Sequence, residues 1–202
     1  MEATINIALV GVGGQGTLLA SEVISRAAML AGADVKKSEV HGMAQRGGSV
    51  VSQVRIGRKV YSPLIPDGEV HYLLSFEMLE ALRYADTLAP DGVALVNRQI
   101  IVPVTVSSGQ QAWVEDLDAR LERAFPHRQL IDALTMARTL GNLRTVNMIM
   151  TGALSRLLTF PAAVWEQAIA ELAPPRHREV NLRALAAGRE ISETAAIPAV
   201  QG

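Results

Sequence analysis

The stretch INIALVGVGGQGTLLASEVISRAAMLAG, from Ile5 to Gly32, decides the fold. It opens with Ile5–Val10, a short apolar run with β-branched members that is typical of a strand buried on both faces. From Thr17 onward, apolar residues recur every three or four positions up to Gly32, which suits the end of a helix. A strand, a glycine turn and an amphipathic helix in this order predict a Rossmann-like start to an α/β sheet.

The rest of the chain continues the alternation of strands and helices. Asp34–Val40 reads as a second strand, which would complete a right-handed crossover unit with the first. Val50–Ile56 alternates apolar and polar residues, and a turn at Gly57-Arg58 predicts a β-hairpin with Lys59–Tyr61. We therefore expect one open twisted sheet in a single domain, residues 1–190, with a helical C-terminal third and a tail at 191–202. Further strands are predicted at 70–76, 93–96 and near 130–133, an extended segment at 100–106, and helices at 78–88, 113–125, 143–157, 161–172 and 176–187.

Composition excludes several classes of function. The 202 residues are 49% hydrophobic, which is enough for a sizeable core, and 19 basic against 20 acidic residues argue against a nucleic-acid binder that neutralises many phosphates. The chain has no cysteine, so it cannot itself hold an iron–sulfur cluster or use a thiol nucleophile. We find no apolar run of eighteen residues and no signal-peptide pattern, which predicts a cytoplasmic protein without a membrane contact.

The glycine turn between the first strand and helix fits the spacing G-x-G-x-x-G. Such a turn lets an anion approach the N–H groups at a helix N-terminus, so a phosphate or carboxylate site is one interpretation. A dinucleotide site also needs an acidic residue at the end of the second strand, but Asp34 comes early and Glu39 late. Close strand–helix packing and a partner surface are the alternatives. The candidate binding residues are Gly11, Gly13, Gly14, Gln15 and Gly16.

A second glycine-rich stretch, HGMAQRGG, follows the second strand from His41 to Gly48. A connection at the carboxyl end of a strand in an open α/β sheet lies where ligands or partners dock. Arg46 could bind an anion with its planar guanidinium, and a plain solvated surface turn is the alternative. The candidate substrate- or partner-facing residues are His41, Gln45, Arg46 and Gly47.

No catalytic residue and no metal ligand is predicted. The histidines His71, His127 and His177 have no metal-ligand spacing with one another or with an acid. The chain also lacks a G-x-S-x-G nucleophile elbow. We therefore interpret the three as ordinary histidines, without a nucleophile–base pair.

Five motifs in a fixed order resemble the gamma-type domain of 2-oxoacid:ferredoxin oxidoreductases, with the strongest likeness to the small beta subunits of the indolepyruvate branch. The resemblance covers residues ~5–190 and is far more specific than the glycine turn alone. The motifs are GVGGQGTLLASEV (Gly11–Val23), EVHGMAQRGGSVVSQVRIG (Glu39–Gly57), YSPLIPDGE (Tyr61–Glu69), FEMLEALR (Phe76–Arg83) and VNMIMTGAL (Val146–Leu154).

The resemblance implies a subunit of an enzyme that oxidatively decarboxylates an aryl pyruvate to an acyl-CoA and reduces ferredoxin. Thiamine diphosphate, magnesium and the iron–sulfur clusters would sit in a large alpha subunit, coenzyme A would be the co-substrate, and the isolated chain would bind no cofactor and be inactive. Two alternatives remain open at this point. One is a stand-alone nucleotide-binding protein for NAD or FAD, from the glycine spacing, and the other is a homo-oligomerisation module, from the apolar stripe at Leu143–Leu157.

Overall fold

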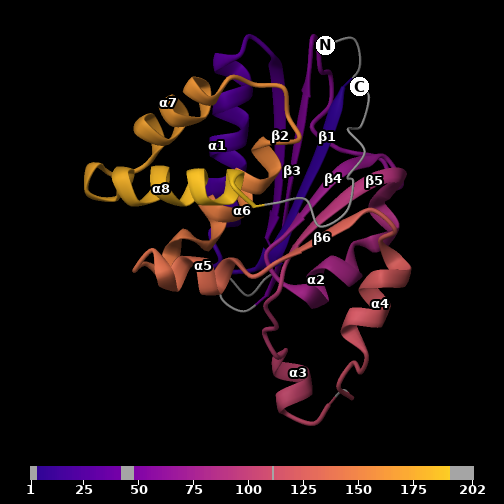
Figure 1. Cartoon of the computed structure of the whole chain (residues 1–202). Coiled ribbons are helices and arrows are strands. Elements are labelled where there is room, and N and C mark those ends of the chain that lie inside the picture. Colours follow the sequence, from indigo (N-terminus) through magenta and orange to yellow (C-terminus); the bar gives the residue numbers. More distant parts are fainter. Residues whose placement is uncertain (1–3, 42–47, 111, 192–202) are drawn as a thin grey trace.

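A six-stranded mixed sheet runs through the centre of the molecule, in the order β2-β3-β1-β4-β5-β6 (Figure 1). The computed structural model describes residues 4–41, 48–110 and 112–191. Strands β1, β4, β5 and β6 are parallel, and β3 runs antiparallel to its neighbours β1 and β2. The strands are β1 (Ile5–Val12), β2 (Asp34–His41), β3 (Ser49–Gly57), β4 (Val70–Ser75), β5 (Leu88–Asn97) and β6 (Arg128–Ile131).

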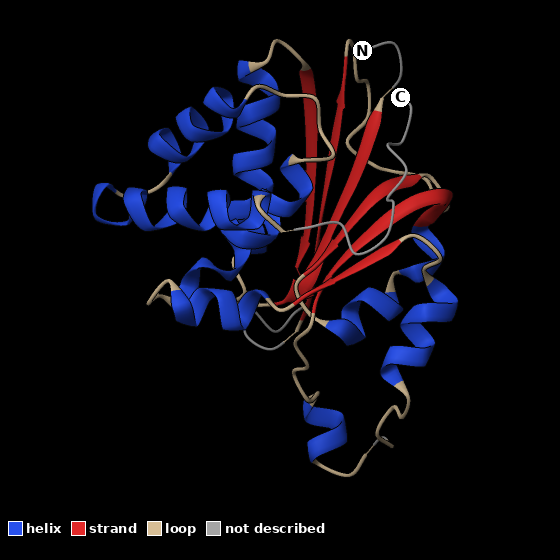
Figure 2. Ribbon diagram, viewed as in Figure 1, coloured by secondary structure: helices blue, strands red, loops and turns tan. Residues whose placement is uncertain are grey.

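Helices cover both faces of the sheet and make up most of the described chain after β6 (Figure 2). The predicted α/β class and the helical C-terminal third are both confirmed. The helices are α1 (Thr17–Leu30), α2 (Met78–Arg83), α3 (Val104–Ser107), α4 (Leu117–Ala124), α5 (Ala133–Thr139), α6 (Val146–Ser155), α7 (Ala162–Leu172) and α8 (Arg178–Arg189), with short 3-10 turns at Ala85–Thr87, Leu143–Thr145 and Pro175–His177.

The predicted hairpin between Val50–Ile56 and Lys59–Tyr61 is wrong. Strand β3 pairs instead with β2 on one side and β1 on the other, so β1 and β2 run in the same direction without being neighbours. Residues 58–61 leave the ladder because the Val60 N–H donates to the Asp34 carboxylate, 2.9 Å away, rather than to a strand. The two antiparallel strands that follow each other in the chain are β2 and β3.

The prediction that Ile100–Val106 is extended is wrong from Val104 on, whereas Pro103 is extended. The segment follows β5, which already pairs with β4 and β6 along both edges. Without a partner strand, the β-branched residues form no ladder, and Val104–Ser107 closes into the short helix α3.

Alternating residues of β1 divide the buried side chains into two cores. Ile7 and Leu9 face α1 and the C-terminal helices, whereas Ala8 and Val10 face α2 and α4. Both faces of the central strand are thus buried, as its continuous apolar run predicts. In Figure 2 the larger helical layer lies to the left of the sheet and the α2–α4 layer to its right.

Candidate functional site

The neighbouring parallel strands β1 and β4 are followed by helices on opposite faces of the sheet. Helix α1 packs on the face that carries Leu9, and α2 packs on the face that carries Val10. The chain thus continues to opposite faces of the sheet after β1 and after β4. Open α/β sheets bind their ligands at such a point, beyond the carboxyl ends of the two strands. We call the carboxyl ends of β1, β4 and β5, with the turns that follow them, the C-terminal edge; it lies at the bottom of Figure 1.

Two features of the turn at this edge favour glycine: positive φ angles and a neighbouring side chain too close for a Cβ atom. Gly14 and Gly16 adopt positive φ angles of 106° and 81°. A Cβ on Gly16 would lie 2.5 Å from the Nδ2 of Asn147 at the start of α6, and this Nδ2 donates to the Gly16 carbonyl at 3.2 Å. The Gly13 N–H donates to the Gly48 carbonyl at 2.9 Å, which ties the turn to the chain just before β3.

The Gln15 side chain is engaged by the protein itself. Its Oε1 accepts from the Val12 N–H at 2.8 Å, and its Nε2 donates to the Phe76 carbonyl at 3.0 Å and approaches the Oε1 of Gln99 at 3.4 Å. A Cβ on Gly11 would lie 2.8 Å from the same Gln15 Oε1. Close packing therefore accounts for Gly11 and Gly16, whereas an added Cβ on Gly14 would have nothing within 4 Å.

Two further amides, Asn97 and Gln99, extend this network, and neither was predicted from the sequence. The fully buried Asn97 donates through Nδ2 to the Phe76 carbonyl at 3.0 Å and to the Gln99 Oε1 at 3.1 Å. Its Oδ1 accepts from the Ala133 N–H at 3.2 Å. Amides directly after a buried strand at this edge, as in Asn97-Arg98-Gln99, are the signal that could have indicated them.

A buried acidic pair also lies at the C-terminal edge and went unnoticed in the sequence. Glu77 caps α2 by accepting from the Glu80 N–H, and Glu80 accepts from the Ser49 hydroxyl and from the Arg83 Nε, the latter at 3.0 Å. Burial raises the pKa of the Glu77 carboxyl, with a smaller contribution from the Glu80 charge, against N–H donors that lower it. The pair joins the first residue of β3 to α2.

The HGMAQRGG loop starts beside the glycine turn. His41, Val50 and Gly11 pair across β2, β3 and β1, so they lie in one row of the sheet. The two glycine-rich segments therefore leave the sheet at the same edge, as predicted. Gln45, Arg46 and Gly47 lie outside the described residues.

Neither acidic candidate for a ribose contact is available. Asp34 begins β2, and its carboxylate accepts from the Val60 N–H and the Lys36 Nζ, each at 2.9 Å; these bonds, the first above all, lower its pKa to about 2. Glu39 forms an ion pair with Lys37 at 2.7 Å. Both carboxylates are engaged within the chain, which does not favour a dinucleotide site.

Across residues 4–41, 48–110 and 112–191, no three His, Asp or Glu side chains converge on a point where a metal ion could bind. His71 accepts from the Asn6 N–H at 3.1 Å, and burial lowers the pKa of its imidazole. No helix in the described parts of the chain combines the length and hydropathy that a membrane span requires.

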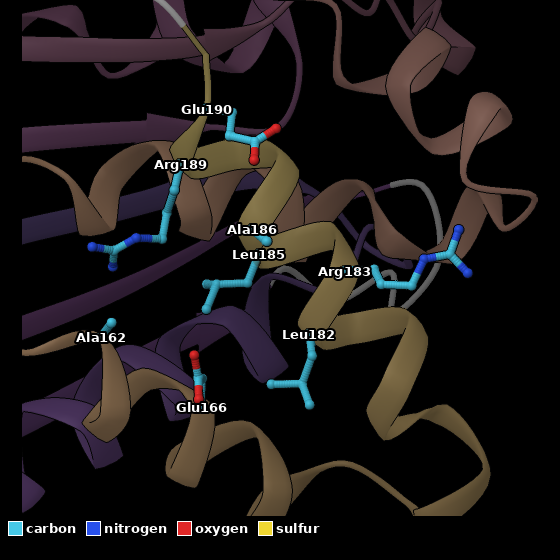
Figure 3. A pocket seen from close by; sticks show the side chains of 8 residues that line it. All are labelled: Ala162, Glu166, Leu182, Arg183, Leu185, Ala186, Arg189 and Glu190. Atoms are coloured by element: carbon cyan, nitrogen blue, oxygen red, sulfur yellow. The ribbon is translucent and has the colours of Figure 1, made fainter.

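A groove of about 570 Å³ lies between α7 and α8, away from the C-terminal edge (Figure 3). Leu182 and Leu185 give it apolar walls, and Glu166 and Arg189 approach it from the two helices. The Arg189 Nη1 donates to the Ser155 hydroxyl at 3.1 Å, so this guanidinium is fixed by its own chain. None of the lining residues comes from the two glycine-rich segments.

Comparison with known proteins gives one consistent result. Residues 6–191 match the family described as pyruvate ferredoxin/flavodoxin oxidoreductase. The indolepyruvate oxidoreductase subunit IorB of Thermococcus kodakarensis is 40% identical over 190 residues, which span 91% of this chain and 93% of that protein.

Solved structures share the fold. The pyruvate oxidoreductase subunit PORC of Thermotoga maritima superimposes with a TM-score of 0.72 at 24% identity, covering 94% of this chain and 97% of PORC. A 2-oxoglutarate:ferredoxin oxidoreductase of Magnetococcus marinus, solved with 2-oxoglutarate, coenzyme A and succinyl-CoA bound, gives a TM-score of 0.72 at 18% identity. There the match covers 94% of this chain but 31% of the other, so the same fold occurs there as part of a longer polypeptide.

Proposed function

Because this chain belongs to the pyruvate ferredoxin/flavodoxin oxidoreductase family, we propose that it is the small subunit of a 2-oxoacid:ferredoxin oxidoreductase that acts on indolepyruvate or a related aryl pyruvate. The observation that carries this proposal is the near full-length identity of 40% to IorB. The five sequence motifs and the PORC-like fold agree with it.

The proposed complex oxidatively decarboxylates the 2-oxoacid, forms the acyl-CoA and passes two electrons to ferredoxin. Thiamine diphosphate supplies the electron sink for the loss of carbon dioxide. We assign it, with magnesium and the iron–sulfur clusters, to a large subunit. The donor set of this chain supports that assignment, because it offers no cysteine for a cluster.

The C-terminal edge is the part of this chain that we assign to the partner and to coenzyme A. The glycine turn and the HGMAQRGG loop leave the sheet side by side. The N-terminus of α1 has no side-chain cap, so its backbone N–H groups favour a negatively charged partner. A guanidinium at position 46 suits an anionic group such as a phosphate. The residues assigned to this surface are Gly13, Gly14, Gln15, Gly16, His41, Gln45, Arg46 and Gly47, and Gln15 contributes its backbone because its side chain bonds within the chain.

The stand-alone nucleotide-binding alternative is not favoured. The named relatives are oxidoreductase subunits, and Asp34 and Glu39 are both engaged in contacts within the chain. We expect calorimetry with NAD, NADP and FAD to detect no micromolar binding by the isolated chain. Tight dinucleotide binding would overturn the subunit assignment.

Co-expression with the large thiamine-dependent subunit tests the proposal directly. We expect a stable complex that reduces ferredoxin with indolepyruvate and coenzyme A, and no activity from either chain alone. Substrate choice is measured by comparing indolepyruvate with pyruvate and 2-oxoglutarate at equal concentration. Turnover by the lone small chain, or failure of the two chains to associate, would refute the assignment.

A single substitution tests the role of the HGMAQRGG loop. Arg46→Ala is expected to leave the melting temperature of the chain unchanged and to lower turnover by the complex, because an anion-binding guanidinium is lost. Arg46→Lys is the matched variant that keeps the charge without the planar fork. Wild-type turnover in Arg46→Ala would remove this residue from the site.

A further inference from the structure

The segment that connects β5 to α4 differs in composition from the rest of the chain. Residues 99–114 contain no Asp, Glu, Lys or Arg, although such residues make up 19% of the sequence. The segment departs from the C-terminal edge and carries α3 away from the sheet, so that it projects from the body of the protein (Figures 1 and 2). We call the described residues of this segment, 99–110 and 112–114, the apolar arm.

The apolar arm exposes large apolar side chains. Ile100, Val102, Val104 and Trp113 are exposed by 44, 52, 76 and 41%, and they are four of the ten large apolar side chains that face solvent among the described residues. Scattered exposed apolar residues are ordinary, but four of them within one uncharged segment of sixteen residues indicate a surface that another molecule covers.

The base of the apolar arm is held in place. The Gln99 carbonyl accepts from the Met78 N–H at 2.9 Å, and the Gln99 side chain accepts from Asn97 at 3.1 Å. Just outside the arm, Arg98 and Asp118 form an ion pair at 3.2 Å across its two ends. A fixed base lowers the ordering cost of binding.

A pocket of about 510 Å³ lies between the apolar arm and α2. Its apolar lining includes Leu82 of α2 with Val106 and Trp113 of the arm, and its two charged lining residues are Arg83 and Arg120. The pocket has the size of a site that accepts a few side chains, with apolar walls and a small number of polar groups.

The two arginines differ in their partners. Arg83 forms an ion pair with Glu80 at 3.0 Å. Arg120 donates to the backbone carbonyl of Glu115 at 3.1 Å, and no carboxylate in the described parts of the chain lies within ion-pair distance of it. The neighbouring acids Glu115 and Asp116 are not among the residues that line this pocket. The pocket therefore offers one cation to an external carboxylate.

We propose that the apolar arm and the pocket beneath it are the docking surface for the large subunit, which places an apolar side chain in the pocket and a carboxylate against Arg120. This inference rests on the proposed function, because that function supplies the second polypeptide. Permanent subunit interfaces are more apolar than transient ones, and a segment of sixteen uncharged residues suits permanent burial.

Two other occupants fit the surface less well. A second copy of this chain, docked by a two-fold axis through the pocket, would place Arg83 and Arg120 against the same arginines of its partner. An electron acceptor that docks transiently relies on several complementary charges, whereas the described residues of this surface offer one cation without a carboxylate partner, Arg120.

Variants of exposed residues test the surface without disturbing the core. Val104→Asp is expected to leave the melting temperature of the isolated chain unchanged and to weaken association with the large subunit by about tenfold or more, because it buries a charge in an apolar interface. Arg120→Glu is expected to weaken association similarly, whereas Arg120→Lys retains most of it. Leu64→Asp is the matched control, since Leu64 is 60% exposed but lies on the connection between β3 and β4.

The dissociation constant of each variant is measured by sedimentation or surface binding with the purified large subunit. Loss of association in Val104→Asp and Arg120→Glu, with a wild-type Leu64→Asp, supports the proposal. Wild-type assembly by both Val104→Asp and Arg120→Glu overturns it and leaves the proposed function intact, whereas failure of the unaltered chain to associate overturns both. Dissociation of a homodimer by Val104→Asp, or a raised KM for ferredoxin with normal assembly, also overturns it in favour of the other occupants.

Discussion

Gly152→Ala is expected to destabilise the protein markedly, because Gly152 lies where α6 crosses α8 at very short distance. A Cβ at this position would lie 2.2 Å from the Leu185 carbonyl oxygen, and a Cβ on the facing Gly188 would lie 2.0 Å from the Ile149 carbonyl oxygen. Real Cβ contacts essentially never fall below 3.0 Å, so the helices must separate by most of an ångström. The obstacle in both cases is backbone and not a flexible side chain.

The size of the effect follows from this geometry. Overpacking a core costs about 1–3 kcal/mol, and an immovable carbonyl places Gly152→Ala at about 2–3 kcal/mol. In a chain of this size each kcal/mol lowers Tm by roughly 2–4 °C, which gives an expected fall of roughly 4–12 °C. Gly188→Ala should cost a similar amount, and the double variant should cost less than the sum, because one separation of the helices accommodates both methyl groups.

Urea unfolding followed by circular dichroism measures these differences, with the m-value as a check that the compactness of the end states is unchanged. Ala186→Ser, on the exposed side of α8, is the control and should stay within about 0.5 kcal/mol of the unaltered chain. Equal stability of Gly152→Ala and the control would refute the close crossing. Additive costs in the double variant would refute the shared separation.

Three further predictions concern the amides and acids at the sheet ends. Glu77→Gln should raise the unfolding free energy at neutral pH. The pKa of Glu77 is raised above its ordinary 4.5, so the unaltered chain loses stability as the pH rises through this pKa. Thermal melts from pH 4 to 8 measure this, and the same pH dependence of Tm in both proteins would contradict it. For Asp34, whose pKa is lowered to about 2, the sign is opposite: the stability difference from Asp34→Asn should be present near neutrality and disappear as pH falls from about 4 to about 2 in thermal melts. Gln15→Ala should cost about 1–3 kcal/mol in urea unfolding even without any ligand, because the Val12 N–H and the Phe76 carbonyl lose their partner, and an unchanged midpoint would show that this side chain is free for a ligand.

Local patterns predicted those elements whose burial follows from their own sequence. The run Ile5–Val10 falls within β1, and the helix expected from Thr17 to its glycine cap is α1. The pairing of strands that are distant in sequence could not be predicted from local patterns. Strand β3 has the expected alternation, but nothing in it indicates that it inserts between β1 and β2, because register and neighbours are set by contacts across the whole sheet.

The site shows the same limit. That the two glycine-rich segments lie at one edge could be predicted, since both follow parallel strands. That Gln15 bonds to its own protein could not, because its partners Phe76 and Gln99 are 61 and 84 positions away in the chain. Residues 100–106 of the apolar arm were predicted to be extended because β-branched residues suit any half-buried surface, including one completed by another chain.

The shared carbonyl of Phe76 has a consequence for how this protein can be recombined or can diverge. It accepts hydrogen bonds from Gln15 and Asn97, and both side chains also contact Gln99. The glycine turn, the residue after β4 and the end of β5 are therefore joined at a single oxygen. A chimera that receives the glycine turn of a relative without the matching amides would leave donors unpaired. Gln15, Asn97 and Gln99 should therefore be retained or replaced together, and a grafted glycine turn should function only when all three amides are transferred with it.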